Sequence, residues 1–206
     1  MTTRLRPAIL VATAFLLCGA ALLAQDTKKK QKAPPLPGAG TGGNTPHATT
    51  SAVIGPNRNE GATIVISYGR PFMKHPRTGE VRKIWGGLVP WDKADRLGAD
   101  EATTLINEYP IEIGGTTLPA GAYTLYIVPA ESGTSKLAIS KHIAKWGVPV
   151  DEKSDIARVD LKKQSLPETV EQLTISIVND PPRSMNGVIK IAWENTQFSV
   201  PFAVKK

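Results

Sequence analysis

The stretch Gly187-Val188-Ile189-Lys190-Ile191-Ala192-Trp193-Glu194 decides the predicted fold of this 206-residue chain. Its large apolar residues Ile189, Ile191 and Trp193 occupy alternate positions. Successive side chains of a β-strand point to opposite faces, so this two-residue period places all three on one face. The stretch therefore predicts a strand in a sheet with one buried and one solvated face, which is typical of antiparallel sheets.

The same alternation recurs along the chain, at residues 64–68 and 173–177, between segments that end at Gly, Pro, Asn or Asp. Further strands are predicted near residues 103–106, 111–113, 123–128, 136–140, 157–161 and 198–204. About nine strands with hairpin spacing predict an all-β fold with little helix. We expect an antiparallel β-sandwich, with a partly open barrel as the alternative.

Turn residues support the hairpin arrangement. Gly114-Gly115 separates two short apolar segments, and adjacent glycines accept the positive φ angles of a two-residue hairpin turn. A second turn is predicted at residues 118–121. The best candidate for helix is a short piece within residues 141–147, where Trp146 is expected to cover the core.

The first fifty residues do not share this pattern. Residues 1–24 are predicted to be a signal peptide, because two arginines precede an apolar run too short to span a bilayer. Residues 25–50 are rich in Lys, Pro and Gly and predict a disordered tether. This leaves residues 51–206 as a single β domain. We expect the protein to be exported to the periplasm or the extracellular space, without a transmembrane helix in its mature chain.

Charge and residue usage exclude several classes of function. Of the formal net charge of +7, only +2 lies on residues 51–206, so the domain lacks the basic surface expected of a nucleic-acid-binding protein. The sole cysteine, Cys18, lies in the predicted signal peptide. The three histidines, His47, His75 and His142, have no metal-ligand spacing. We therefore expect no disulfide, no metal and no cofactor.

No catalytic set is recognisable, since a Gly-x-Ser-x-Gly elbow is absent and the mature chain has no cysteine. A long segment from residue 68 to residue 101 instead carries tryptophans, arginines and carboxylates, and long ordered loops in compact domains are often functional. The candidate ligand-binding residues are Arg70, Trp85, Trp91, Arg96, Glu101, Tyr126 and Glu194.

The candidates other than Arg70 also have a structural interpretation. Trp85 and Trp91 would plug one end of the sandwich, while Arg96 would bridge to the carboxylates that follow it. Tyr126 and Glu194 would be ordinary surface residues of a sheet. In the functional interpretation, tryptophan supplies an apolar platform and arginine supplies charged donors to a sugar, a carboxylate or a similar small ligand.

Four blocks of sequence resemble domain-of-unknown-function family 2911. They are residues 84–90, 96–104 (Arg-Leu-Gly-Ala-Asp-Glu-Ala-Thr-Thr), 118–125 and 192–195. The chain departs from the usual family pattern at Asp95, Leu97 and Asp100, where the family commonly has Trp, Thr and Asn. The resemblance covers residues 50–206 and implies an exported bacterial protein, but it implies no activity.

These observations favour a non-catalytic exported domain that binds a small polar ligand or saccharide at the tryptophan- and arginine-bearing segment of residues 68–101. One alternative is a hydrolase that uses Glu101 with Arg96. The other is a structural or interaction protein of the cell envelope, whose partner would be another envelope protein. The residues leave the ligand and the oligomeric state open.

Overall fold

The computed structural model describes residues 45–206. The predicted signal peptide and most of the predicted tether lie outside these residues. In the described part, eleven strands and one short 3₁₀ turn follow one another along the chain. The strands are β1 (His47–Ile54), β2 (Ala62–Gly69), β3 (Asp95–Arg96), β4 (Thr103–Asn107), β5 (Ile111–Ile113), β6 (Thr116–Leu118), β7 (Gly121–Val128), β8 (Lys136–Ser140), β9 (Asp155–Asp160), β10 (Lys162–Asn179) and β11 (Asn186–Val204).

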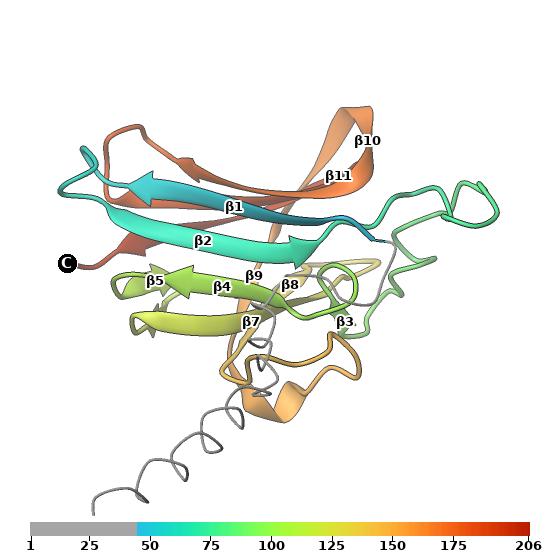
Figure 1. The fold of residues 1–206 in the computed structure, drawn as a ribbon, viewed down its shortest axis with the longest axis horizontal. Coiled ribbons are helices and arrows are strands. Elements are labelled where there is room, and N and C mark those ends of the chain that lie inside the picture. The colour runs from blue at the N-terminus through green and yellow to red at the C-terminus, as the bar shows by residue number, and fades with distance from the viewer. Residues whose placement is uncertain (1–44) are drawn as a thin grey trace, which may run out of the picture. The chain divides into compact units, whose positions relative to one another are not determined.

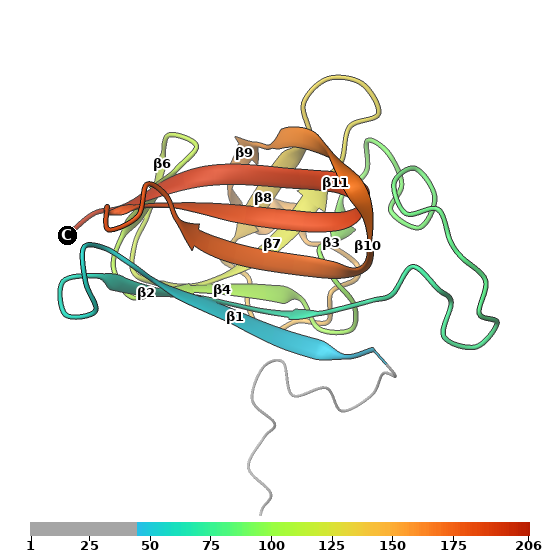
Figure 2. The same cartoon turned by 90° about the horizontal axis from the view of Figure 1, so that it is seen from above.

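The strands form two antiparallel sheets. The larger sheet has the order β1-β2-β4-β7-β8-β9, with β3 paired to β7 beside β4, and the smaller has the order β10-β11-β5-β6. Neither sheet closes on itself, so the architecture is a sandwich and not a barrel. Figure 2 shows β10 and β11 of the smaller sheet, in orange and red, lying across β7 and β8 of the larger one. The prediction of an all-β antiparallel sandwich is confirmed.

One core lies between the sheets and follows from the alternation in the sequence. In β11, Ile189, Ile191 and Trp193 are buried, whereas Lys190 and Ala192 between them are half-buried on the other face. The same pattern in β2, β4, β7 and β10 contributes apolar side chains to a single cluster. Burying apolar surface is the main favourable term of folding, so these faces hold the two sheets together.

The predicted two-residue hairpin is present between β5 and β6. Gly114 and Gly115 have φ angles of 55° and 80°, and the flanking residues Ile113 and Thr116 are paired across the turn. Residues other than glycine adopt these angles at a cost, because their Cβ atom meets the backbone. This turn places β6 at the edge of the smaller sheet.

Three features differ from the sequence-based expectations. Residues 141–147 contain no helix, and the helical turn within residues 45–206 is a 3₁₀ turn at Glu152–Ser154. Strand β1 begins at His47, so the folded part begins before residue 51. Finally, the two strands predicted over residues 187–194 and 198–204 are one strand, β11, whose ladder with β10 shifts in register on both sides of the Glu194–Val170 pair. A β-bulge lets a strand bend and continue, which explains why the pattern breaks without ending the strand.

Segments outside the strands cover one end of the sandwich. The segment between β2 and β3, green in Figure 1, carries Trp85, whose ring packs edge-on against Trp193 and Phe198 of β11. The indole Nε1 of Trp85 donates a hydrogen bond to the carbonyl of Trp193 at 3.2 Å. Within residues 45–206, no helix has the length and apolar character needed to cross a membrane.

Candidate ligand-binding site

Two cavities flank the segment that begins with β3. We call this segment, residues 95–101, the Arg96 loop. The first cavity, the Trp146 cavity, has a volume of about 630 Å³, and the second, the Asp95 cavity, has a volume of about 500 Å³. Both volumes lie in the range of about 300–1,000 Å³ that is usual for small-molecule sites. Arg96 and Val148 line both cavities, so the Arg96 loop forms the wall between them.

Close packing of glycines holds the Arg96 loop in place. Gly69 at the end of β2 lies so near the loop that a Cβ atom on it would be 2.2 Å from the carbonyl oxygen of Ala99. On the other side, a Cβ atom at Gly147 would be 2.6 Å from Cδ of Arg96. The amide of Gly147 also donates a hydrogen bond to the carbonyl of Asp100 at 2.9 Å. These contacts fix where the Arg96 side chain starts.

A second segment, residues 141–151, which we call the Trp146 loop, covers the Trp146 cavity. The amide of Ala102 donates to the carbonyl of Lys145 at 3.0 Å, and the amide of Lys141 donates to the carbonyl of Ser154 at 3.2 Å. The loop is therefore held at its first residue and near its middle. Trp146 nevertheless keeps 51% of its surface exposed, so the expectation that it covers the core is wrong. A tryptophan ring half in solvent can act as a platform for a ligand.

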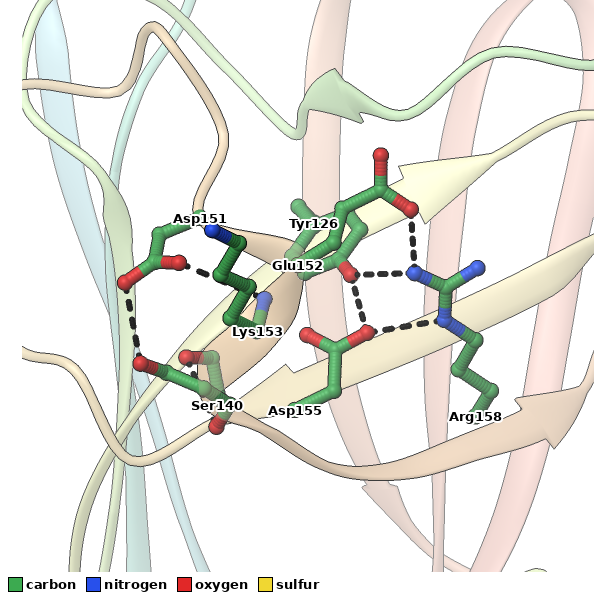
Figure 3. A network of polar contacts seen from close by, with 8 residues as sticks. Tyr126, Ser140, Asp151, Glu152, Lys153, Asp155 and Arg158 are labelled. Carbon is green, nitrogen blue, oxygen red and sulfur yellow. Dashed lines mark hydrogen bonds and ion pairs between the residues drawn. The ribbon is translucent and has the colours of Figure 1, made fainter.

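A polar network forms one side of the Trp146 cavity. Figure 3 shows Glu152, Asp155 and Arg158 gathered around the hydroxyl of Tyr126. This hydroxyl donates to Oδ2 of Asp155 and accepts from Nη2 of Arg158 at 3.0 Å, and Nε of Arg158 donates to the same carboxylate at 2.8 Å. Arg158 also pairs with Glu152. The network joins β7 to β9 and to the 3₁₀ turn before β9.

The network keeps Tyr126 neutral and Arg158 charged. Burial raises the pKa of Tyr126 above its usual value, and the hydrogen bond to Asp155 raises it further. The pKa of Arg158 is also raised, chiefly by its hydrogen bond to Glu152 and then by that to Asp155. Because its hydroxyl is already engaged on both sides, Tyr126 contributes its ring to the cavity more than its oxygen.

A histidine and a carboxylate pair lie at the mouth of the Trp146 cavity. Nδ1 of His142 lies 2.7 Å from Oδ2 of Asp151, and the hydroxyl of Ser154 donates to the same oxygen at 2.9 Å. The hydrogen bond from His142 lowers the pKa of Asp151, and the bond from Ser154 adds to this effect. Among residues 45–206, no group of three or more His, Cys, Asp and Glu side chains is arranged to hold a metal ion.

The remaining charged groups of the Trp146 cavity are cationic. Asp151 and Glu152 are engaged by His142 and Arg158. By contrast, Arg96, Lys145 and Lys153 form no ion pair with any residue of the described part of the chain. The guanidinium of Arg96 makes one weak contact, a hydrogen bond of 3.4 Å from Nη1 to the carbonyl of Asp100. The cavity therefore offers three positive charges that form no ion pair within the described residues.

Of the seven candidates from the sequence, Arg96 and Tyr126 line the Trp146 cavity. The other five line neither of the two cavities. Nε of Arg70 donates to the carbonyl of Leu173 at 3.1 Å and ties β2 to β10. Trp85 is buried in the core, and the ring of Trp91 packs beneath the ammonium group of Lys163 at 5.1 Å. Trp85 in the core and Trp91 packed against it have the surroundings that their structural interpretation describes.

The two carboxylate candidates lie apart from Arg96. Oε2 of Glu101 is 3.0 Å from Nε2 of His47, the first residue of β1, and this contact closes the end of the sheet. Glu194 lies at the register shift between β10 and β11, with a φ angle of 56°. Among the described residues, Arg96 and Glu101 form no ion pair with each other.

Sequence reasoning missed His142 and Lys145 of the Trp146 loop and Lys153 of the 3₁₀ turn that follows it, and it expected Trp146 to cover the core. The loop has no two-residue period and no motif, so its sequence carries little signal. The sequence indicated a site here only by residue types, since the stretch is charged, contains glycine and proline, and carries an isolated tryptophan.

The fold and the two cavities define the class of protein: an antiparallel β-sandwich in which loops line cavities large enough for a small ligand. Comparison with known families places the chain more closely. Residues 46–202 match the family described as protein of unknown function (DUF2911), and the chain belongs to this family. The resemblance noted in four blocks of the sequence is thereby confirmed. No curated protein and no solved structure gives a significant match.

Proposed function

We propose that the domain binds a small anionic ligand with a sugar-like apolar face in the Trp146 cavity, without acting on it chemically. A carboxylated saccharide has this chemistry. The observation that carries the proposal is the meeting of the half-exposed Trp146 ring with three cationic side chains, Arg96, Lys145 and Lys153, in one cavity. Each cation lacks an ion-pair partner within the described residues.

The geometry of the cavity gives each side chain a different role in binding. The Trp146 ring offers a flat apolar surface on which the C–H groups of a sugar ring can lie. Arg96 is rigidly placed by Gly147 and can offer two parallel donors to a carboxylate, whereas the two lysines act as point charges. The ring of Tyr126, fixed by Asp155 and Arg158, lines the same cavity.

The test is isothermal titration of the full chain with glucuronate and, as the neutral counterpart, glucose. We expect glucuronate to bind and glucose to bind at least tenfold more weakly. Trp146→Ala and Lys153→Ala should each weaken glucuronate binding several-fold. Lys162→Ala is the matched control, because Lys162 is exposed on β10 and does not line the cavity. Equal binding of the two sugars, no binding of either, or an equal loss in Lys162→Ala would refute the proposal.

We further propose that the chain is exported, so that the ligand is met in the periplasm or outside the cell. The support is the predicted signal peptide of residues 1–24. Sequencing the N-terminus of the mature protein tests this. Cleavage near Ala24 is expected, and an intact N-terminus in the cytosol would contradict export.

A further inference from the structure

The Asp95 cavity, on the other side of the Arg96 loop, contains acidic groups that lack hydrogen-bond partners among the described residues. Asp95 makes no side-chain hydrogen bond and no ion pair within residues 45–206, although it is half-buried. Oδ2 of Asp100 is buried and also lacks a hydrogen-bond partner there. Nε2 of His47 is 3.9 Å from this oxygen, which is beyond hydrogen-bond distance.

A third polar group of this cavity without a hydrogen-bond partner among the described residues is a donor, whereas the two carboxylates are acceptors. Trp193 of β11 lines the Asp95 cavity, with only 3% of its surface exposed. Its indole Nε1 is a donor, and it finds no acceptor among the described residues. Buried polar atoms are nearly always hydrogen-bonded, so two such atoms, on Asp100 and Trp193, at one cavity call for an explanation.

The backbone at this place is held in an unfavourable conformation. Asp100 has a φ angle of 63°, in the left-handed region that residues with a Cβ atom rarely adopt. The loop keeps this conformation because Gly69 packs against Ala99 and the hydroxyl of Thr103 donates to the carbonyl of Leu97. Strain of this kind persists where the surroundings impose it, and it concentrates at functional sites.

The unpaired carboxylate also opposes folding. Burial raises the pKa of Asp95, which means that the folded protein disfavours the ionised form, and the nearby charge of Arg96 offsets this only in part. An uncharged residue at this position would avoid the effect. A group that lowers stability and faces a cavity is typical of binding sites, where stability and function compete.

Another part of the lining of the Asp95 cavity is basic. The segment between β2 and β3 contributes Lys74 and Arg77, neither of which forms an ion pair within the described part of the chain. Arg82 of the same segment is occupied, because its guanidinium donates to the carbonyls of Phe72 and Met73. The cavity thus combines the carboxylates of the Arg96 loop, beside Arg96 itself, with an ammonium and a guanidinium group from the segment between β2 and β3.

We propose that the Asp95 cavity is a second binding site, for a zwitterionic amino compound with a free ammonium group and a free carboxylate. The ammonium group is recognised by Asp95 and Asp100, and the carboxylate by Lys74 and Arg77. A neutral acceptor atom of the ligand, such as a peptide carbonyl, accepts from Trp193. Free amino acids and short peptides share this chemistry, and the volume of about 500 Å³ accommodates either.

The test compares four probes on the full chain by isothermal titration: L-alanine, trialanine, N-acetylalanine and alanine amide. We expect L-alanine or trialanine to bind, and the preferred one identifies a free amino acid or a peptide as the ligand. N-acetylalanine lacks the ammonium group and alanine amide lacks the carboxylate, so each should bind at least tenfold more weakly than L-alanine or trialanine. Binding of neither zwitterion, or equal binding of the blocked probes, overturns the proposal.

Variants separate this site from the Trp146 cavity. Asp95→Asn and Arg77→Ala should each weaken zwitterion binding at least tenfold, whereas Lys153→Ala and the exposed-surface control Glu131→Gln should leave it unchanged. Asp95→Asn removes a destabilising charge and should remain folded, which its thermal unfolding verifies. Unchanged affinity in Asp95→Asn and Arg77→Ala would overturn the assignment. A loss in Lys153→Ala equal to that in Asp95→Asn would overturn the separation of the two sites.

Discussion

Replacing Gly69 by alanine should destabilise the protein and disturb the wall between the two cavities. The added Cβ atom would lie 2.2 Å from the carbonyl oxygen of Ala99 and 2.9 Å from its carbonyl carbon. Both are backbone atoms, so no side-chain rotation relieves the contact. Restoring an ordinary separation of about 3.4 Å requires the Ala99 carbonyl to move by about 1 Å.

The magnitude follows from the cost of overpacking. Forcing atoms into a closely packed region typically costs about 1–3 kcal/mol. A glycine-to-alanine change also reduces the entropy of the unfolded chain and stabilises by about 0.4–1 kcal/mol where the site tolerates it. The steric term is larger, so we expect a net loss of about 1–2 kcal/mol in the free energy of unfolding. For a domain of this size, this corresponds to a fall in Tm of about 2–8 °C.

Urea unfolding followed by tryptophan fluorescence measures the effect. Gly121→Ala is the matched control, because Gly121 is also in a strand and its added Cβ atom would meet no atom nearer than 3.6 Å. We expect Gly121→Ala to be as stable as the unmodified protein or slightly more stable. If Gly69→Ala proves as stable as Gly121→Ala, the Arg96 loop is not held by this contact and the reasoning fails.

Two further predictions concern single side chains. Tyr126→Phe should lower the free energy of unfolding by about 1–3 kcal/mol, because the buried carboxylate of Asp155 loses a donor. Tyr109→Phe is its control, since the Tyr109 hydroxyl makes no hydrogen bond within residues 45–206. Asp95→Asn should become more stable relative to the unmodified protein as the pH rises from 4 to 7. The free energy of unfolding of both proteins is measured by urea unfolding at the two pH values. The pKa of Asp95 is higher in the folded state than its unfolded value near 3.8. As the pH rises above 3.8, the folded protein therefore holds more protons than the unfolded chain, and the unmodified protein loses stability. If the two proteins differ in stability by the same amount at pH 4 and pH 7, this reasoning is contradicted.

Much of the fold could be predicted because alternation is visible in single segments. Residues 111–113 and 136–140 are strands with the predicted bounds. Strand β1 escaped notice because its sequence, His-Ala-Thr-Thr-Ser-Ala-Val-Ile, has small or polar residues at the positions that would mark a buried face. Strand β3 has only two residues, too few for any period to appear.

Less of the candidate site could be predicted. Arg96 and Tyr126 were singled out by their residue types, and both line the Trp146 cavity. Trp85 has the same residue type as Trp146, yet it is buried while Trp146 is half-exposed. Residue type alone does not distinguish these two, because exposure depends on which segments pack over each ring.

The sequence by itself determined which segments are extended and which face of each is buried, because these follow from a two-residue period within one strand. Only the tertiary structure decided that Gly147 meets Asp100, that His47 meets Glu101, and that two cavities open on either side of Arg96. The physical reason is that these contacts join residues far apart in the chain. They depend on the pairing and layering of whole strands, which no local pattern of residues encodes.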